Sequence, residues 1–156
     1  MNAVTVQRAI IENAEEILEL QKLAYISEAE LIGDFSIPPL RQTMDDIRSE
    51  FASQIFLKAE IDNRIIGSVR TFLARESGHI GKLIVHPDFQ NRGIGTRLLN
   101  AAERQFPDAE RYELFTGQKS ARNLYFYGKN GYRAFKHVKV SEKLSLVFME
   151  KNKRKT

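Results

Sequence analysis

Apolar and polar residues alternate in several short stretches of this chain, a pattern typical of half-buried strands. The clearest stretch is residues 55–61, IFLKAEI, which is followed by a turn at Asp62-Asn63 and a second stretch over residues 65–73. Together they predict a β-hairpin. Similar patterns predict further strands over residues 4–10, 80–85, 112–116, 133–138 and 144–149.

Elsewhere apolar residues recur every three or four positions, which predicts amphipathic helices. The expected helices cover residues 14 to about 28, 43 to about 52, 94–106 and 120–129. Asn13 is expected to cap the first of them. Gly33, Pro38 and Pro39 interrupt the pattern, so residues 31–40 are expected to be irregular.

Strands and helices follow one another in the order β-α-α-β-β-β-α-β-α-β-β, which predicts one α/β layered structure. A chain of 156 residues is long enough to bury its own core. It contains no cysteine, which excludes disulfides, thiolate metal ligands and a cysteine nucleophile, and we expect no metal. Neither a signal peptide nor a run of about 20 apolar residues is present, so a cytoplasmic protein without a membrane span is expected.

The net charge of +4 is concentrated at one end of the chain. The last six residues, KNKRKT, contain four cations and no acid, so the remainder is neutral by formal count. We therefore expect residues 151–156 to form a solvated, flexible tail after a single domain of residues 1–150. A nucleic-acid partner recruited by this tail is the less favoured alternative.

Residues 83–98, LIVHPDFQNRGIGTRL, carry the strongest functional signal. A short apolar strand is followed by a loop with Gly93 and Gly95 and then by an amphipathic helix. Glycines let the backbone approach a ligand closely, and the free amides of a first helical turn attract anions. This arrangement indicates a phosphate or pyrophosphate site, to which Arg92 and Arg97 could add hydrogen bonds. The alternative interpretation is a glycine-capped turn with solvated arginines.

Two motifs resemble those of the GNAT N-acetyltransferase superfamily. Residues 85–99 match V-H-P-x-x-Q-x-x-G-I-G-x-x-L-L, which is similar to the acetyl-CoA loop of that family. Residues 120–133, SARNLYFYGKNGYR, are similar to its last helix, in which a tyrosine stands four residues before a Gly-Phe or Gly-Tyr pair, as Tyr127 does here. A dinucleotide-binding unit fits less well, because it requires a third glycine and an acid about 20 residues further on.

The resemblance implies a GNAT-like fold. It has a central mixed sheet of about six or seven strands, about four helices on its two faces, and a splay between the central strands that admits the pantetheine arm of acetyl-CoA. It also implies acetyl transfer from acetyl-CoA to a small-molecule or peptide amine, by direct attack in a ternary complex, in a monomer or homodimer. The alternative is a non-catalytic module of the same fold that binds or senses acyl-CoA.

The resemblance further assigns cofactor-binding residues. The backbone of the strand residues Leu83, Ile84 and Val85 would pair with pantetheine. The residues that would surround the pyrophosphate or shape its turn are Gln90, Asn91, Arg92, Gly93, Ile94, Gly95 and Thr96. Ser120 replaces the asparagine that the family often has there, and it is interpreted as a helix N-cap. Asn123, one turn later, would contact pantetheine in its place.

Tyr127 is the predicted general acid, because a phenol with a pKa near 10 keeps its proton at neutral pH and can donate it to the departing thiolate. An aromatic residue that only packs is the alternative. A backbone amide near Leu83 would polarise the thioester carbonyl. No base is assigned, since Gly81 and Phe115 occupy positions where GNAT relatives carry glutamate. The substitutes considered are Glu76, His79 and Glu113.

The acceptor site is expected in the N-terminal half of the chain, as the resemblance implies. Tyr25, Glu28, Glu30 and Asp34 lie close together in sequence. Acidic groups there would favour a cationic acceptor, such as a polyamine, an amino sugar or a peptide amine. The alternative is that they are scattered, solvated acids.

Overall fold

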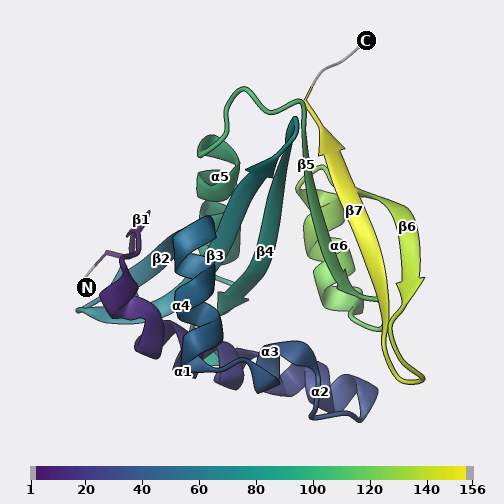
Figure 1. The fold of residues 1–156 in the computed structure, drawn as a ribbon, viewed down its shortest axis with the longest axis horizontal. Coiled ribbons are helices and arrows are strands. Elements are labelled where there is room, and N and C mark those ends of the chain that lie inside the picture. Colours follow the sequence, from purple (N-terminus) through teal and green to yellow (C-terminus); the bar gives the residue numbers. More distant parts are fainter. Residues whose placement is uncertain (1–2, 154–156) are drawn as a thin grey trace.

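The structure, a computed structural model, describes residues 3–153. Its centre is a seven-stranded sheet with the strand order β1-β2-β3-β4-β5-β7-β6 (Figure 1). The strands span Thr5–Arg8 (β1), Ile55–Ile61 (β2), Arg64–Ala74 (β3), Ser77–Val85 (β4), Arg111–Gly117 (β5), Arg133–Lys139 (β6) and Ser145–Asn152 (β7). Neighbouring strands are antiparallel except for β4 and β5, which run parallel. The expected mixed sheet is confirmed.

Six α-helices accompany the sheet in the described residues, two more than the sequence pattern predicted. They span Ala14–Ala24 (α1), Ile26–Ile32 (α2), Pro38–Arg41 (α3), Met44–Ser53 (α4), Ile94–Arg104 (α5) and Ala121–Lys129 (α6), with short 3-10 turns at Ile11–Asn13 and Pro87–Phe89. The additional helices arise because the predicted first helix is divided at Tyr25, and because residues 31–40 are not wholly irregular.

Glycine and proline in this segment mark the end of one helix and the start of the next. Gly33 ends α2 in the left-handed conformation, with φ of 70°, which costs glycine little. Pro38 and Pro39 lie in the first turn of α3. Backbone amides in a first turn have no hydrogen-bond partner within the helix, so proline, which lacks the amide proton, is tolerated there. The prediction of an irregular segment was therefore wrong at both ends.

Helix capping also differs from the prediction at one helix. Asn13 does not cap α1, because its Oδ1 accepts a hydrogen bond from the Ile10 amide at 2.9 Å. Thr43, at which the second helix was expected to begin, caps α4. Its Oγ1 accepts from the Asp46 amide at 3.1 Å, and the Asp46 carboxylate accepts from the Thr43 amide at 2.9 Å.

Two clusters of buried side chains lie on opposite faces of the sheet. On β2, Phe56 packs with α1 and α4, whereas Leu57 packs with α5. On β3, Ile65 packs in the cluster of α1 and α4, and Ile66 packs in the cluster of α5. Because successive strand residues point to opposite faces, α1 and α4 cover one face and α5 the other. Tyr127 of α6 belongs to the same cluster as α5.

The two central strands separate along their length, as the resemblance implied. Strands β4 and β5 pair only where residues 77–79 lie beside residues 111–113. Beyond His79 they diverge, and the gap widens toward the N-terminus of α6 (Figure 1). A bulge opposite Val69 distorts β4 at Lys82, whose φ is 47°. The sheet is thus two half-sheets joined at one end.

The chain end differs from the expected tail. Lys151 and Asn152 belong to β7, and the Lys151 Nζ lies 3.0 Å from the Glu103 carboxylate. Lys153 donates its amide to the Glu110 carbonyl at 3.0 Å. The boundary predicted at residue 150 is therefore placed too early, because β-pairing continues past it, and residues 154–156 lie outside the described range. Within that range, no helix has the length and apolar character needed to cross a membrane.

Candidate active site

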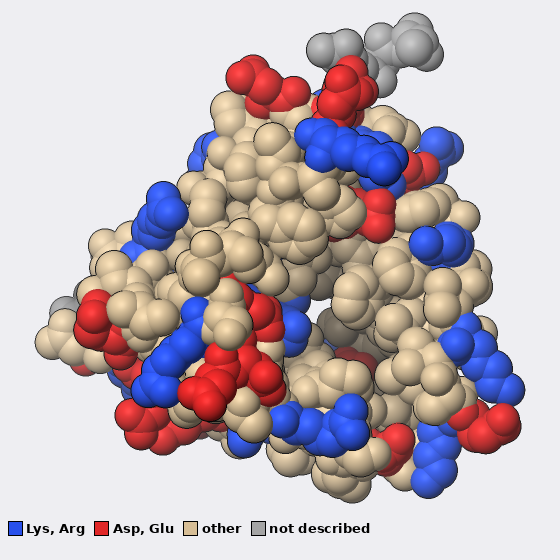
Figure 2. Space-filling model, in the orientation of Figure 1, with Lys and Arg blue, Asp and Glu red and all other residues tan. Residues whose placement is uncertain are grey.

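A cavity of about 1600 Å³ fills the splay between the two half-sheets. Figure 2 shows the surface hollowed there, between the part that carries β1–β4 and the part that carries β5–β7. Its lining comes from α1 to α4, from β4 and the N-terminus of α5, and from β5 and α6. Segments far apart in sequence therefore share one solvent-accessible space.

The loop before α5 presents unpaired backbone amides to this cavity. Asn91 and Gly93 both have left-handed backbone angles, with φ of 62° and 80°. The first hydrogen bond inside α5 runs from the Arg97 amide to the Gly93 carbonyl at 3.1 Å, so the amides of residues 94–96 have no partner within the helix. Ile94, Gly95 and Thr96 all line the cavity. This geometry, with the positive end of the helix dipole, is that of an anion site.

The two glycines of the loop have different roles. A Cβ on Gly93 would meet nothing within 4 Å, so that glycine faces open space and is required for its positive φ. A Cβ on Gly95 would lie 3.3 Å from Cζ of Phe126, so that glycine allows α5 and α6 to pack closely. Gln90 donates from Nε2 to the Val85 carbonyl at 3.3 Å, which ties the loop back to β4.

The arginines of the loop point elsewhere. The Arg92 guanidinium lies over the Phe89 ring at 5.2 Å, and Arg97 donates to the Val4 carbonyl at 2.9 Å. Neither residue lines the cavity. The expected contribution of the Arg97 side chain is therefore wrong, because its Nη1 donates to the Val4 carbonyl, just before β1. The loop therefore offers backbone amides, not arginine side chains, to the cavity.

Strand β4 offers a second row of backbone groups. Leu83, Ile84 and Val85 line the cavity, beyond the point where β5 has diverged. Its other edge still pairs with β3, where Ile84 lies opposite Ser68 and Gly81 opposite Arg70. The edge that faces the splay can therefore pair with an extended ligand as a further strand would.

Tyr127 reaches the cavity from α6 and is 7% exposed. Its ring packs edge-on against Phe126 and Tyr132, with centroids 5.3 Å and 6.1 Å away. Its hydroxyl makes no hydrogen bond to the residues that the structure describes. Burial raises the pKa of this phenol, and the nearby Tyr25 and Glu28 raise it further. Tyr127 therefore keeps its proton at neutral pH.

Glu28 of α2 bridges the mouth of the splay to α6. Its Oε1 accepts hydrogen bonds from Ser120 Oγ at 3.1 Å and from Asn123 Nδ2 at 3.3 Å. Asn123 Nδ2 also lies 3.2 Å from Thr116 Oγ1. Ser120 stands at the N-cap position of α6, but its side chain makes no capping hydrogen bond, so its interpretation as an N-cap was wrong. The Ser120 hydroxyl donates to Glu28 instead, because α2 lies close to the N-terminal end of α6.

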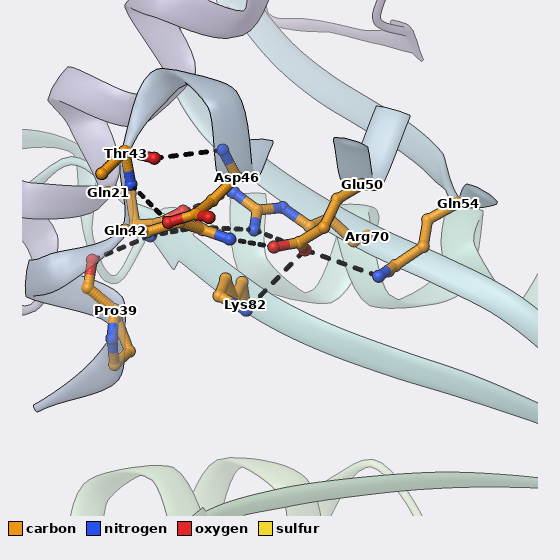
Figure 3. A network of polar contacts seen from close by, with 9 residues as sticks. All are labelled: Gln21, Pro39, Gln42, Thr43, Asp46, Glu50, Gln54, Arg70 and Lys82. Carbon is orange, nitrogen blue, oxygen red and sulfur yellow. Dashed lines mark hydrogen bonds and ion pairs between the residues drawn. The ribbon is translucent and has the colours of Figure 1, made fainter. Parts of the chain in front are cut away.

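A second polar network lines the cavity on the side of β3 and α4 (Figure 3). Arg70 of β3 has a side chain only 2% exposed, and its Nη1 lies 2.9 Å from Glu50 Oε1 and 3.1 Å from Gln42 Oε1. Its Nη2 donates to Gln21. The Lys82 Nζ lies 3.9 Å from the same Glu50 oxygen. Burial, together with the Arg70 charge, lowers the pKa of Lys82, and Glu50 opposes this effect.

Sequence reasoning missed this network. The one sign of it in the sequence was an arginine within the strand sequence RIIGSVRTFLA. A cation buried in a strand needs polar partners, and these come from other elements of the fold. Gln21, Gln42 and Glu50 come from α1, the end of α3 and α4, and no local pattern marks them as neighbours of Arg70.

The candidate bases and the residues expected at the acceptor site do not all lie at the cavity, and some that do already have partners. His79 and Glu113 line the cavity, but His79 stacks on Phe72 at 4.8 Å, and the Glu113 carboxylate lies 2.9 Å from Arg111. Glu76 lines a separate, smaller hollow. Of the expected acceptor residues, Tyr25 and Glu28 line the cavity, whereas Glu30 and Asp34 do not.

A family model for the GNAT acetyltransferase domain matches residues 37–153. This chain belongs to the GNAT acetyltransferase family. The matched region includes every strand after β1 and both motifs that face the cavity. No group of three or more histidine, aspartate or glutamate side chains in the described part of this GNAT domain is placed to hold a metal ion.

Solved structures of the family share the fold. The PaiA N-acetyltransferase of Thermoplasma acidophilum, solved with coenzyme A, has a TM-score of 0.80 at 18% identity, over 96% of this chain and 99% of that one. YncA from Salmonella typhimurium, solved with acetyl-CoA, has a TM-score of 0.77 at 15% identity, over 99% and 96%. A GNAT acetyltransferase of Staphylococcus aureus gives 0.78 at 20% identity, over 97% and 100%.

One curated relative is similar in sequence. The UPF0157 protein YqkA of Bacillus subtilis is 33% identical over 133 residues, which is 85% of this chain. The chain spans 38% of the length of that relative.

Proposed function

We propose that this GNAT domain transfers an acetyl group from acetyl-CoA to an amine, by direct attack in a ternary complex. The observation that carries the proposal is a single cavity that joins the free amides of α5, the unpaired edge of β4 and the hydroxyl of Tyr127. The coenzyme A and acetyl-CoA complexes of PaiA and YncA, which share the fold, support the choice of donor.

The donor would bind mainly through backbone groups. The amides of residues 92–96 would hold the pyrophosphate, in a loop shaped by Gln90 and Asn91. Leu83, Ile84 and Val85 would pair with pantetheine along the free edge of β4. The Leu83 amide, which lies beside the β4 bulge, would then polarise the thioester carbonyl. Asn123 stands where it can reach the same arm from α6.

Tyr127 would act as the general acid. Attack by the amine nitrogen forms the C–N bond, and collapse of the tetrahedral intermediate breaks the C–S bond. The Tyr127 hydroxyl, which retains its proton, can donate it to the departing thiolate. The acetylated nitrogen then returns a proton to the tyrosinate. The acceptor is a small-molecule or peptide amine that enters from the side of α1 to α4.

Thermal unfolding with and without acetyl-CoA, longer acyl-CoAs and NAD tests the donor. A ligand at 100 times its dissociation constant stabilises the native state by about 2.7 kcal/mol. We expect acetyl-CoA to raise the Tm and NAD to leave it unchanged. Release of CoA thiol is then measured with a panel of amines. Binding of acetyl-CoA without thiol release from any amine would instead support the alternative of an acyl-CoA sensor.

A further inference from the structure

We propose that Glu28 accepts the proton of the acceptor ammonium, and that the acceptor is a cationic amine that binds against this carboxylate. The inference deepens the proposed function and rests on it. It supplies the base that neither Gly81 nor Phe115 can provide. Within the described residues, Glu28 is the glutamate that reaches the cavity next to Tyr127 without a cationic partner.

The hydrogen bonds of Glu28 hold its carboxylate in a defined place. Ser120 and Asn123 both donate to Oε1, at 3.1 Å and 3.3 Å. The other oxygen, Oε2, accepts no hydrogen bond from the described residues. Gly117 lies beside it, and a Cβ there would be 3.8 Å from Oε2. One oxygen therefore anchors the side chain, and the other is free to meet a ligand.

The surroundings of Glu28 bring it close to the proposed acid. Glu28 accepts a hydrogen bond from Asn123, and Tyr127 follows one helical turn later on the same face of α6. The negative charge of Glu28 also contributes to the raised pKa of both Tyr25 and Tyr127. Tyr25 lies at the junction of α1 and α2, and its pKa also responds to Arg70 of β3. The cations that line the same cavity are Arg41, Arg70, Lys82, Lys119, Arg122 and Lys129.

The other acids that line the cavity already have fixed partners. The Asp46 carboxylate accepts the Thr43 amide at 2.9 Å as part of the α4 cap. Glu50 lies between Arg70 and Lys82, and Glu113 pairs with Arg111. A carboxylate that is paired with a fixed cation loses much of its attraction for a substrate ammonium. Glu28 is held by a hydroxyl and an amide, both neutral, so its full charge faces the ligand.

The protons balance along this route. The bound ammonium gives one proton to Glu28, and the free nitrogen attacks the thioester carbon. The C–S bond breaks, the thiolate takes the Tyr127 proton, and the acetylated nitrogen returns its remaining extra proton to the tyrosinate. Glu28 releases its proton to solvent through the open cavity. An amine with a pKa near 10 is about one part in a thousand unprotonated at pH 7, which is why a base is needed.

Glu28→Gln separates a catalytic role from a merely structural clamp. The glutamine oxygen can still accept from Ser120 and Asn123, but it cannot take a proton. We expect the dissociation constant of acetyl-CoA to stay within twofold by calorimetry, while kcat/KM for the amine found in the panel falls about 100-fold at pH 7. The loss should shrink toward pH 10, where free amine becomes abundant. Glu19→Gln, the same change at an exposed position of α1, should leave kcat/KM unchanged.

Ser120→Ala tests the anchor. Ser120 is a positioning residue here, so we expect a loss of about tenfold in kcat/KM with the acidic limb of the pH profile retained. Turnover of Glu28→Gln within twofold of the parent chain at pH 7 would overturn the proposal about Glu28 alone. An unmodified chain that binds acetyl-CoA but acetylates no amine would overturn the proposed function as well.

Discussion

The two sides of the cavity are built in different ways. On the donor side, residues 90–96 and the edge of β4 present backbone amides and carbonyls whose positions follow from one loop and one strand. On the acceptor side, Gln21, Glu28, Glu50 and Arg70 come from four elements and meet only through the fold. A backbone site depends on few side chains, whereas a side-chain network can change without altering the sheet.

This difference suggests a division of labour. In the proposed function the donor stays the same whatever the acceptor is, so its site can rest on glycine geometry and a helix end. Acceptor choice requires charge and shape, which side chains supply. Substitutions on the acceptor side should therefore change stability or turnover, and those in the donor loop should change affinity for acetyl-CoA. Four predictions test this, starting with the largest effect.

Arg70→Met should cause the largest loss of stability. It leaves Glu50, Gln21 and Gln42 without their buried cation, and removing one partner of such a network costs about 3 kcal/mol. Urea unfolding measures the change. Arg48→Ala, which removes an exposed pair with Asp45, should cost less than about 0.5 kcal/mol. Equal losses for the two variants would show that the network does not stabilise the acceptor side.

Tyr127→Phe should lower kcat about 100-fold, because the thiolate then leaves without a proton donor. The dissociation constant of acetyl-CoA, measured by calorimetry, should stay within about threefold. The matched control is Tyr132→Phe, which removes a hydrogen bond of 2.8 Å to Glu103 outside the cavity. It should cost about 1 kcal/mol of stability and leave kcat unchanged. Full turnover of Tyr127→Phe would mean that the tyrosine only packs.

Gly93→Ala should weaken acetyl-CoA binding about tenfold. The new Cβ would occupy open space, but an alanine at φ of 80° is strained by about 1 kcal/mol, which would shift the loop that leads into the α5 amides. Gly128→Ala makes the same chemical change inside α6, where the Cβ would meet nothing, and should leave binding intact while stabilising the fold by about 0.5 kcal/mol. Calorimetric titration of both variants decides whether the loop binds the donor.

Tyr25 should make the protein less stable at alkaline pH. Burial raises the pKa of Tyr25 to about 12, against 10 for an ordinary phenol. Between pH 10 and 12 the unfolded chain therefore releases a proton that the native protein retains, so stability is complete below pH 10 and falls as pH rises. One such group contributes at most about 1.4 kcal/mol per pH unit. Unfolding of Tyr25→Phe across this range should show a shallower fall, and parallel curves would contradict the assignment.

Local patterns revealed more of the fold than of the acceptor site. The strand spacing, the Asp62-Asn63 turn, the start of a helix near Thr43 and the glycine loop were all visible because their signals span a few neighbouring residues. The errors were also local. Gly33 and Pro38 suggested a loop where they mark a helix end and a helix start, because the same residue types serve both purposes.

The sequence alone determined the order of the strands, the strand-loop-helix arrangement of residues 83–98 and the resemblance of its two motifs to the GNAT family. These properties depend on backbone preferences and short periodicities, which act between near neighbours. Only the tertiary structure decided that Glu28 meets Ser120, 92 residues away, and that Arg70 meets Gln21, 49 residues away. Such contacts form because the packing of the two half-sheets and their helices brings together side chains that are far apart in sequence. A short stretch of sequence carries no signal for such a contact.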